Sequence, residues 1–103
     1  MDIIKNALIS DLLGIYGNLL TEYQLEIMEL YYFEDLSLKE IAENKNVSRN
    51  AIFTLIKRVE NILLNYEDKL KLNIKLKNIE KRLINEDKNL KEDIINILLE
   101  EGE

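Results

Sequence analysis

Hydrophobic residues recur at every third or fourth position along almost the whole chain. This spacing places them on one face of an α-helix, so the chain is expected to be all-α. The pattern predicts a first helix over about residues 2–13, ended by Gly14 and Gly17 because glycine adopts helix-ending conformations without steric cost. The inner side of this helix is expected to carry four apolar residues, Ile4, Leu8, Leu12 and Ile15.

Two capping boxes, at residues 21–24 and 37–40, mark the starts of the next two helices. In a capping box, a hydroxyl side chain and the Gln or Glu three residues later satisfy each other's free backbone N–H groups. The first box predicts a helix beginning at Thr21, and the second predicts a short helix from Ser37 to about Asn44. The helix from Thr21 would turn three residues inward, Leu25, Met28 and Tyr32. Its outer face would be acidic, with Glu22, Glu26 and Glu29.

The longest helical pattern begins after Ser48, whose hydroxyl is expected to cap a fourth helix of about 20 residues. Its regularly spaced apolar positions are Ile52, Leu55, Ile56, Val59, Ile62, Leu63 and Tyr66. Residues 70–103 carry two further helical patterns, separated near residues 85–87. We interpret the chain as one helical domain over residues 1–103, with residues 70–103 as a C-terminal helical extension.

Residues 37–58 have the features of a helix-turn-helix. This motif needs a small residue where its two helices cross, a turn residue that tolerates left-handed backbone, and apolar residues that hold the second helix at its angle. Ala42 is the small residue, and Asn46 is the turn residue because asparagine enters the left-handed region more readily than most residues. The expected packing positions are Ile41, Val47, Ile52 and Leu55.

The composition excludes several kinds of chemistry. Histidine and cysteine are both absent, so a zinc site, a disulfide framework and a histidine- or thiolate-based catalytic pair are ruled out. We therefore expect no enzymatic activity, no metal and no cofactor. The N-terminus shows no basic leader, and no apolar run approaches the roughly 18 residues needed to cross a bilayer. A cytoplasmic protein is expected.

Charge distinguishes residues 45–59 from the rest of the chain. The chain has net charge −6, yet this window holds four basic residues and no acidic residue. On the fourth helix, the exposed side would carry Arg49, Asn50, Phe53, Thr54 and Lys57. Arginine and asparagine can bind base edges bidentately, and lysine or arginine suits phosphates. The alternative is an ordinary solvated helix face, with Phe53 belonging to a core or an interface.

A second basic stretch lies over residues 69–82, where six basic residues accompany one acid, Glu80. These residues are either solvated lysines around an apolar stripe or a surface for RNA phosphates. The apolar content of residues 59–99 also has two interpretations. In the first, these residues form a dimer interface, which would hold two recognition helices roughly 34 Å apart on DNA. In the second, the C-terminal part of the chain folds back on the first helix within a monomer.

Five short segments, in order along the chain, resemble the YlxM-like (UPF0122) family of small bacterial helix-turn-helix proteins, which is similar to region four of sigma factors. The matching segments are residues 16–21, 29–32, 35–43, 47–53 and 56–58, so the likeness covers about residues 10–72. The resemblance implies a winged-helix-like, all-helical DNA-binding fold, no enzymatic activity, and dimers. It also implies a nucleic-acid-binding face made of Ser48, Arg49, Asn50, Phe53, Thr54, Lys57 and Arg58.

The resemblance further implies a regulatory role connected with the signal recognition particle GTPases. This chain departs from the family pattern at positions 50, 54 and 55, where Gln, Asp and Asn are expected, so sequence-specific reading does not follow from the likeness. Two functional hypotheses result. The protein is a regulator that binds DNA or the RNA of the signal recognition particle, or it is an adaptor that binds a protein such as a signal recognition particle GTPase through its acidic helix face.

Overall fold

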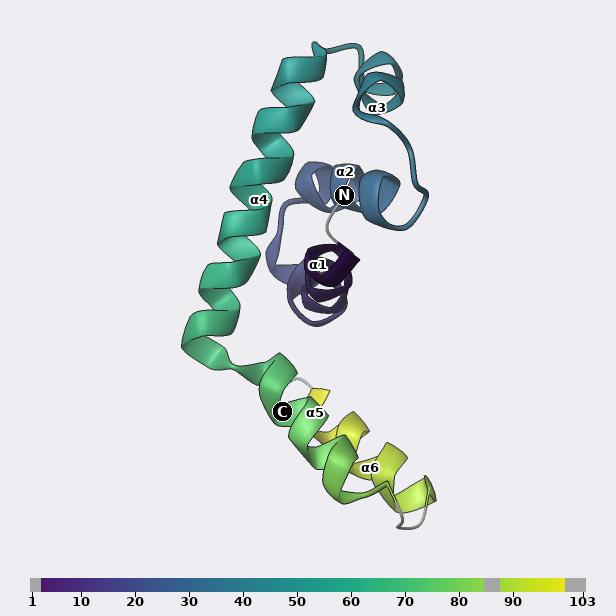
Figure 1. The fold of residues 1–103 in the computed structure, drawn as a ribbon, viewed down its shortest axis with the longest axis vertical. Helices are drawn as coiled ribbons and strands as arrows, with labels where there is room; N and C mark the ends of the chain where they lie inside the picture. The colour runs from purple at the N-terminus through teal and green to yellow at the C-terminus, as the bar shows by residue number, and fades with distance from the viewer. Residues whose placement is uncertain (1–2, 85–87, 100–103) are drawn as a thin grey trace. The chain divides into compact units, whose positions relative to one another are not determined.

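The computed structural model describes residues 3–84 and 88–99 of the chain. These residues form six α-helices and one short 3-10 turn, with no strand among them (Figure 1). In chain order the elements are α1 (Ile3–Tyr16), η1 (Gly17–Leu19), α2 (Glu22–Tyr32), α3 (Leu38–Lys45), α4 (Arg49–Leu70), α5 (Leu72–Arg82) and α6 (Lys88–Leu99). The prediction of an all-α helix-turn-helix fold is confirmed. The break expected near residues 85–87 lies outside the described residues.

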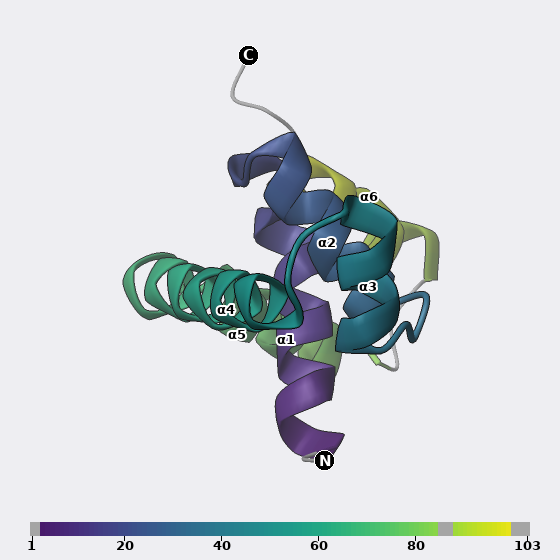
Figure 2. The same ribbon diagram turned by 90° about the horizontal axis from the view of Figure 1, so that it is seen from above.

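The helices group into two units, residues 1–70 and 71–103. The interpretation of the chain as one domain with an extension stays a prediction. In the first unit, α1, α2 and α3 all pack along the same side of the long helix α4 (Figures 1 and 2). The short helix α3 lies beside the N-terminal part of α4, and α1 lies beside its C-terminal half, so α4 holds the unit together.

The core of the first unit lies between α4 and these three helices. It consists of twelve buried hydrophobic residues, Ile9, Leu12, Leu13, Tyr16, Ile27, Met28, Ile41, Ala42, Ile52, Ile56, Val59 and Leu63. The α4 contribution follows the helical repeat, since Ile52, Ile56, Val59 and Leu63 are spaced by four, three and four residues. Fully burying one such side chain stabilises a fold by roughly 1.5–3 kcal/mol, so this stripe fixes α4 firmly in place.

The prediction that Gly14 ends the first helix is wrong, because α1 continues to Tyr16. The reason lies in packing beyond the glycine. Tyr16 is buried, its hydroxyl donates to Glu67 Oε1 of α4 at 2.8 Å, and its ring lies 5.8 Å from that of Tyr66. These contacts keep the last turn helical and override the weak preference of one glycine. The α-helix gives way at Gly17, as expected, to the 3-10 turn.

The predicted inner face of α1 is only partly right. Ile4 is 82% exposed, whereas the residues that α1 buries are Ile9, Leu12, Leu13 and Tyr16. Leu8 and Ile15 pack against the edge of the core. Apolar residues surround most of this helix, so the spacing alone does not select which of them face α4.

The second helix begins as predicted, with Thr21 as its cap and the complete capping box in place. Met28 is fully buried, and so is Ile27, which the expected stripe of Leu25, Met28 and Tyr32 omitted. Leu25 and Tyr32 are half-buried. The acidic residues predicted for the outer face are all exposed: Glu22, Glu26 and Glu29.

The second unit contains α5 and α6. Leu76 and Ile79 of α5, together with Leu98 and Leu99 of α6, line a common apolar cavity of about 330 Å³. Several large apolar side chains of this unit remain exposed: Ile74, Ile84, Ile97, Leu98 and Leu99. None of the helices in the described ranges is sufficiently long and apolar to cross a membrane.

Candidate nucleic-acid interface

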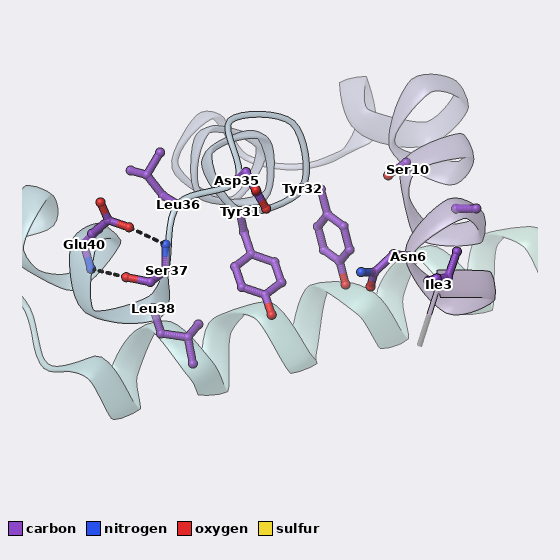
Figure 3. A pocket seen from close by; sticks show the side chains of 11 residues that line it. Ile3, Asn6, Ser10, Tyr31, Tyr32, Asp35, Leu36, Ser37, Leu38 and Glu40 are labelled. Atoms are coloured by element: carbon purple, nitrogen blue, oxygen red, sulfur yellow. Dashed lines mark hydrogen bonds between the residues drawn. The ribbon is translucent and has the colours of Figure 1, made fainter. Parts of the chain in front are cut away.

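Local hydrogen bonds cap both ends of α3, the first helix of the helix-turn-helix. At the start of α3, the Glu40 backbone N–H donates to Ser37 Oγ at 3.1 Å and the Ser37 N–H donates to Glu40 Oε1 at 2.9 Å (dashed in Figure 3). The Ser37 backbone N–H lowers the pKa of the Glu40 carboxyl, because it stabilises the charged form. The predicted capping box is therefore confirmed.

The turn between the helices is made by Asn46, as predicted. Asn46 adopts the left-handed conformation, with φ 56° and ψ 46°, directly after the last residue of α3. The Val47 N–H then donates back to the Ala42 carbonyl oxygen at 3.0 Å, which closes the end of α3 in a Schellman-type arrangement. The chain is thereby turned toward α4 within a few residues.

The start of α4 is capped by Ser48, whose hydroxyl accepts a hydrogen bond from the Ala51 N–H at 3.0 Å. Ile41, Ala42 and Ile52 are buried where α3 meets α4, as the motif requires. The expectation that Val47 packs between the helices is wrong, since this residue is 40% exposed. It lies in the turn, and turns between helices run over the protein surface.

The seven predicted site residues lie together on the turn and the first part of α4, and every one of them is exposed: Ser48, Arg49, Asn50, Phe53, Thr54, Lys57 and Arg58. Asn50, Thr54 and Lys57 are spaced by four and three residues, so they share one helix face. No acidic residue lies between Ser48 and Val59. The residues thus form a continuous exposed surface, called the α4 face below. That this surface binds nucleic acid stays a prediction.

Lys57 has two neighbours that the sequence reasoning missed. Its ammonium nitrogen lies 5.5 Å from the centre of the Phe53 ring and 3.6 Å from Glu60 Oε1. Phe53 is 44% exposed, so it is neither a core residue nor fully solvated, and its ring supports the lysine as a cation–π partner. Lys57 therefore lies between an aromatic ring of the face and a carboxylate.

Glu60 is a buried carboxylate on the inner side of the α4 face. Its side chain is 6% exposed, its Oε2 accepts a hydrogen bond from the Tyr32 hydroxyl, and its Oε1 lies 3.0 Å from the Lys5 ammonium. Burial by itself raises the pKa of this carboxyl, but the Tyr32 hydrogen bond and the cations Lys5 and Lys57 outweigh burial, so the pKa is lowered. Burial and the Glu60 carboxylate together raise the pKa of the Tyr32 hydroxyl. The sequence contains a signal for the burial of Glu60, because this residue stands four positions after Ile56 and three before Leu63, on the apolar stripe.

Lys45, the first cation of the basic window, does not belong to the α4 face. Its ammonium is paired with the Glu26 carboxylate of α2, and it lies 5.8 Å from the centre of the Tyr23 ring. Only 14% of the Lys45 side chain is exposed. The window of residues 45–59 therefore contributes three cations to the surface instead of four, namely Arg49, Lys57 and Arg58.

A groove of about 620 Å³ lies on the first unit between α1, the end of α2 and the loop that leads to α3. Tyr31 and Tyr32 extend side by side into it, with Asn6 and Ser10 of α1 across from them (Figure 3). The centres of the two tyrosine rings lie 5.0 Å apart, and the rings are oriented edge to face. Within the described ranges, no group of three or more His, Cys, Asp or Glu side chains could hold a metal ion.

A capped short helix, a left-handed asparagine turn and a second helix with an exposed cationic face define a helix-turn-helix protein. The family model described as "Putative helix-turn-helix protein, YlxM / p13 like" matches residues 3–100. The chain belongs to this family, and the resemblance found in the sequence is confirmed.

The chain is similar to several curated relatives that carry the name UPF0122 protein. It is 54% identical over 72 residues to the protein of Clostridium kluyveri, a match covering 70% of this chain and 65% of that relative. It is 54% identical over 86 residues to the protein of Clostridium acetobutylicum, covering 84% and 67%. It is 52% identical over 85 residues to the protein of Fusobacterium nucleatum, covering 82% and 79%. The match thus spans just under two thirds of the length of the Clostridium kluyveri relative.

Proposed function

We propose that this protein is a non-enzymatic regulator that binds nucleic acid through the α4 face. The observation that carries the proposal is the exposure of all seven face residues on a stretch without any acid, in a chain of net charge −6. Polyanions bind where cations are concentrated locally, whatever the total charge of the protein. Membership of a helix-turn-helix family supports the same proposal.

In the proposed complex, the first turns of α4 enter the major groove, which is about 12 Å wide and admits one α-helix. Asn50 and Thr54 are the candidates for base edges, because they lie at the centre of the exposed face. Arg49, Lys57 and Arg58 are the candidates for phosphates. Packing of α4 through its buried stripe would keep these side chains in fixed register with the groove.

The three positions that depart from the family pattern, 50, 54 and 55, differ in how exposed their side chains are. Leu55 is half-buried against the core, so it acts here as a packing residue. Asn50 and Thr54 are exposed and remain available to a ligand. The proposal therefore includes binding to backbone phosphates, and any base preference would depend on these two side chains.

Three finer parts of the proposal come from the family resemblance. They are a setting in the signal recognition particle pathway, with its RNA as a candidate ligand, a homodimer, and a cytoplasmic location. The exposed apolar residues Ile74, Ile97 and Leu99 in the second unit support the homodimer, because pairing of two copies would remove them from water.

A second candidate function is an adaptor that binds a basic protein partner, such as a signal recognition particle GTPase. The observation that favours it is the exposed acidic face of α2, with Glu22, Glu26 and Glu29. Glu26 already pairs with Lys45, so Glu22 and Glu29 would be the main contacts.

Salt-dependent binding distinguishes the two functions. Duplex DNA, signal recognition particle RNA and the targeting GTPase are titrated in parallel over a range of salt concentrations. Three phosphate contacts by the α4 face predict a log–log slope of roughly −3 per subunit for duplex DNA. Arg49→Ala should reduce the magnitude of this slope by about one. Lys69→Ala, which removes a cation from the last turn of the same helix, is the matched control and should leave the slope unchanged. Absence of binding to duplex DNA and structured RNA even at low salt would reject the proposal.

A further inference from the structure

Glu60 links Lys57 of the α4 face to side chains of α1 and α2. Lys57 of the face and Lys5 of α1 both approach the same carboxylate oxygen, Oε1, at 3.6 and 3.0 Å. The second oxygen, Oε2, is occupied by the Tyr32 hydroxyl of α2. One buried carboxylate therefore accepts contacts from three helices, and one of these contacts involves a residue of the proposed interface.

The two lysines compete for the charge of Glu60. A buried carboxylate must be paired, because an isolated charge in the interior is strongly disfavoured. Lys5 supplies the shorter contact and Lys57 the longer one, while about half of the Lys57 side chain, 48%, stays exposed. The more fully Lys5 neutralises Glu60, the less strongly Lys57 is attracted inward, away from a phosphate outside.

We propose that Glu60 and Lys5 are positioning residues that set how strongly Lys57 engages a nucleic-acid phosphate. Glu60 restrains Lys57, and Lys5 relieves this restraint by sharing the carboxylate. The inference rests on the proposed function of the α4 face. It adds that binding strength at this face is adjusted from α1, by a side chain that lies outside the helix-turn-helix.

Glu60→Gln is the central variant, because glutamine has nearly the same shape and its side-chain oxygen can still accept the Tyr32 hydrogen bond. The substitution removes the charge that attracts Lys57. Half-exposed ion pairs contribute modestly, so binding to a duplex should become roughly two- to fivefold tighter, with a steeper salt dependence. Lys5→Met should have the opposite effect, weakening binding by a similar factor, because Lys57 alone would then neutralise the carboxylate.

Double variants separate this coupling from a general change in charge. Lys5→Met should have no effect on duplex binding when Glu60 is already glutamine, because no carboxylate is left to share. Glu60→Gln should likewise have no effect when Lys57 is already methionine. If Glu60→Gln does not fold, the pair Lys5→Met with and without Lys57→Met provides the same test. Lys5 is 41% exposed, so its removal should be tolerated.

The measurement is fluorescence anisotropy of a labelled DNA duplex over a salt series, with circular dichroism to verify folding of each variant. Opposite changes for Glu60→Gln and Lys5→Met, both abolished in the double variants, would support the coupling. Unchanged or weaker binding by folded Glu60→Gln would overturn it, and so would a Lys5→Met effect that persists in the Glu60→Gln background. Failure of the wild-type protein to bind any duplex would instead reject the proposed function, and the inference with it.

Discussion

The turn of the helix-turn-helix depends on one asparagine, and Asn46→Val should therefore destabilise the first unit. Asn46 has φ 56° and ψ 46°, which lies in the left-handed region. Asparagine enters this region at low cost, whereas a β-branched side chain clashes with its own backbone there. The left-handed conformation costs an ordinary L-residue roughly 1–2 kcal/mol, and this cost should appear directly in the free energy of unfolding.

The expected loss is large compared with the stability of a unit of this size. A domain gains roughly 0.05–0.15 kcal/mol per residue, so residues 1–70 should have an unfolding free energy of about 4–10 kcal/mol. One kcal/mol changes the melting temperature of a small domain by about 4–8 °C, so Asn46→Val should lower it by roughly 5–15 °C. Asn46→Gly should change it much less, because glycine accepts the left-handed conformation and only its greater freedom in the unfolded chain opposes folding.

The assay is thermal and urea unfolding followed by circular dichroism at the helix signal. Asn44→Val is the matched control, because Asn44 is an exposed position within α3 where valine and asparagine have similar helix propensities. The reasoning requires Asn46→Val to unfold well below Asn44→Val. Equal melting temperatures for the two valine variants, or equal losses for Asn46→Val and Asn46→Gly, would refute it.

Three further substitutions test the core, a helix interior and the buried carboxylate. Ile52→Ala should lower the unfolding free energy by roughly 2–5 kcal/mol in urea titrations, since Ile52 is almost fully buried; a smaller loss would mean that the contact of α3 with α4 is loosely packed. Gly14→Ala should raise thermal stability by about 0.5–1 kcal/mol, because Gly14 is inside α1 and an added Cβ meets no atom within 4 Å; no gain would contradict a regular helix there. The lowered pKa of Glu60 means that its charge stabilises the fold above the unfolded value of about 4.3, and this contribution is lost as the pH falls through the lower folded value. The stability difference between the wild type and Glu60→Gln should therefore shrink between about pH 7 and about pH 3, and a constant difference would contradict the paired carboxylate.

The features that the sequence predicts well are those made by residues close together in the chain. The caps at Thr21, Ser37 and Ser48 each join groups three residues apart, so the residue types alone define them. The left-handed turn at Asn46 is also local. The exposure of the α4 face follows from the spacing of the apolar stripe on the other side of the same helix.

The features that the sequence does not predict depend on contacts between distant elements. Gly14 stays helical because Tyr16 reaches Glu67, which is 51 positions away. Lys45 is removed from the basic surface by Glu26, 19 positions earlier. Ile4 was misplaced for another reason, since a helix that is apolar on most sides gives no periodic signal of its buried face.

The α4 face of this acidic chain is cationic for two reasons: the sequence places no acid between Ser48 and Val59, and packing buries the acid that follows. The first acid after Ser48 is Glu60, and packing turns it inward to Lys5 and Tyr32. Neither Arg49 nor Arg58 forms an ion pair within the described part of the chain, so their charge stays directed outward. Lys57 belongs to the α4 face and also contacts the buried Glu60 carboxylate. Because the same helix supplies the core stripe and the exposed face, a substitution at Glu60 acts on stability and on the proposed binding at once. The salt dependence of binding is then the measurement that separates the two effects, since a loss of folding lowers the amount of active protein without changing the slope.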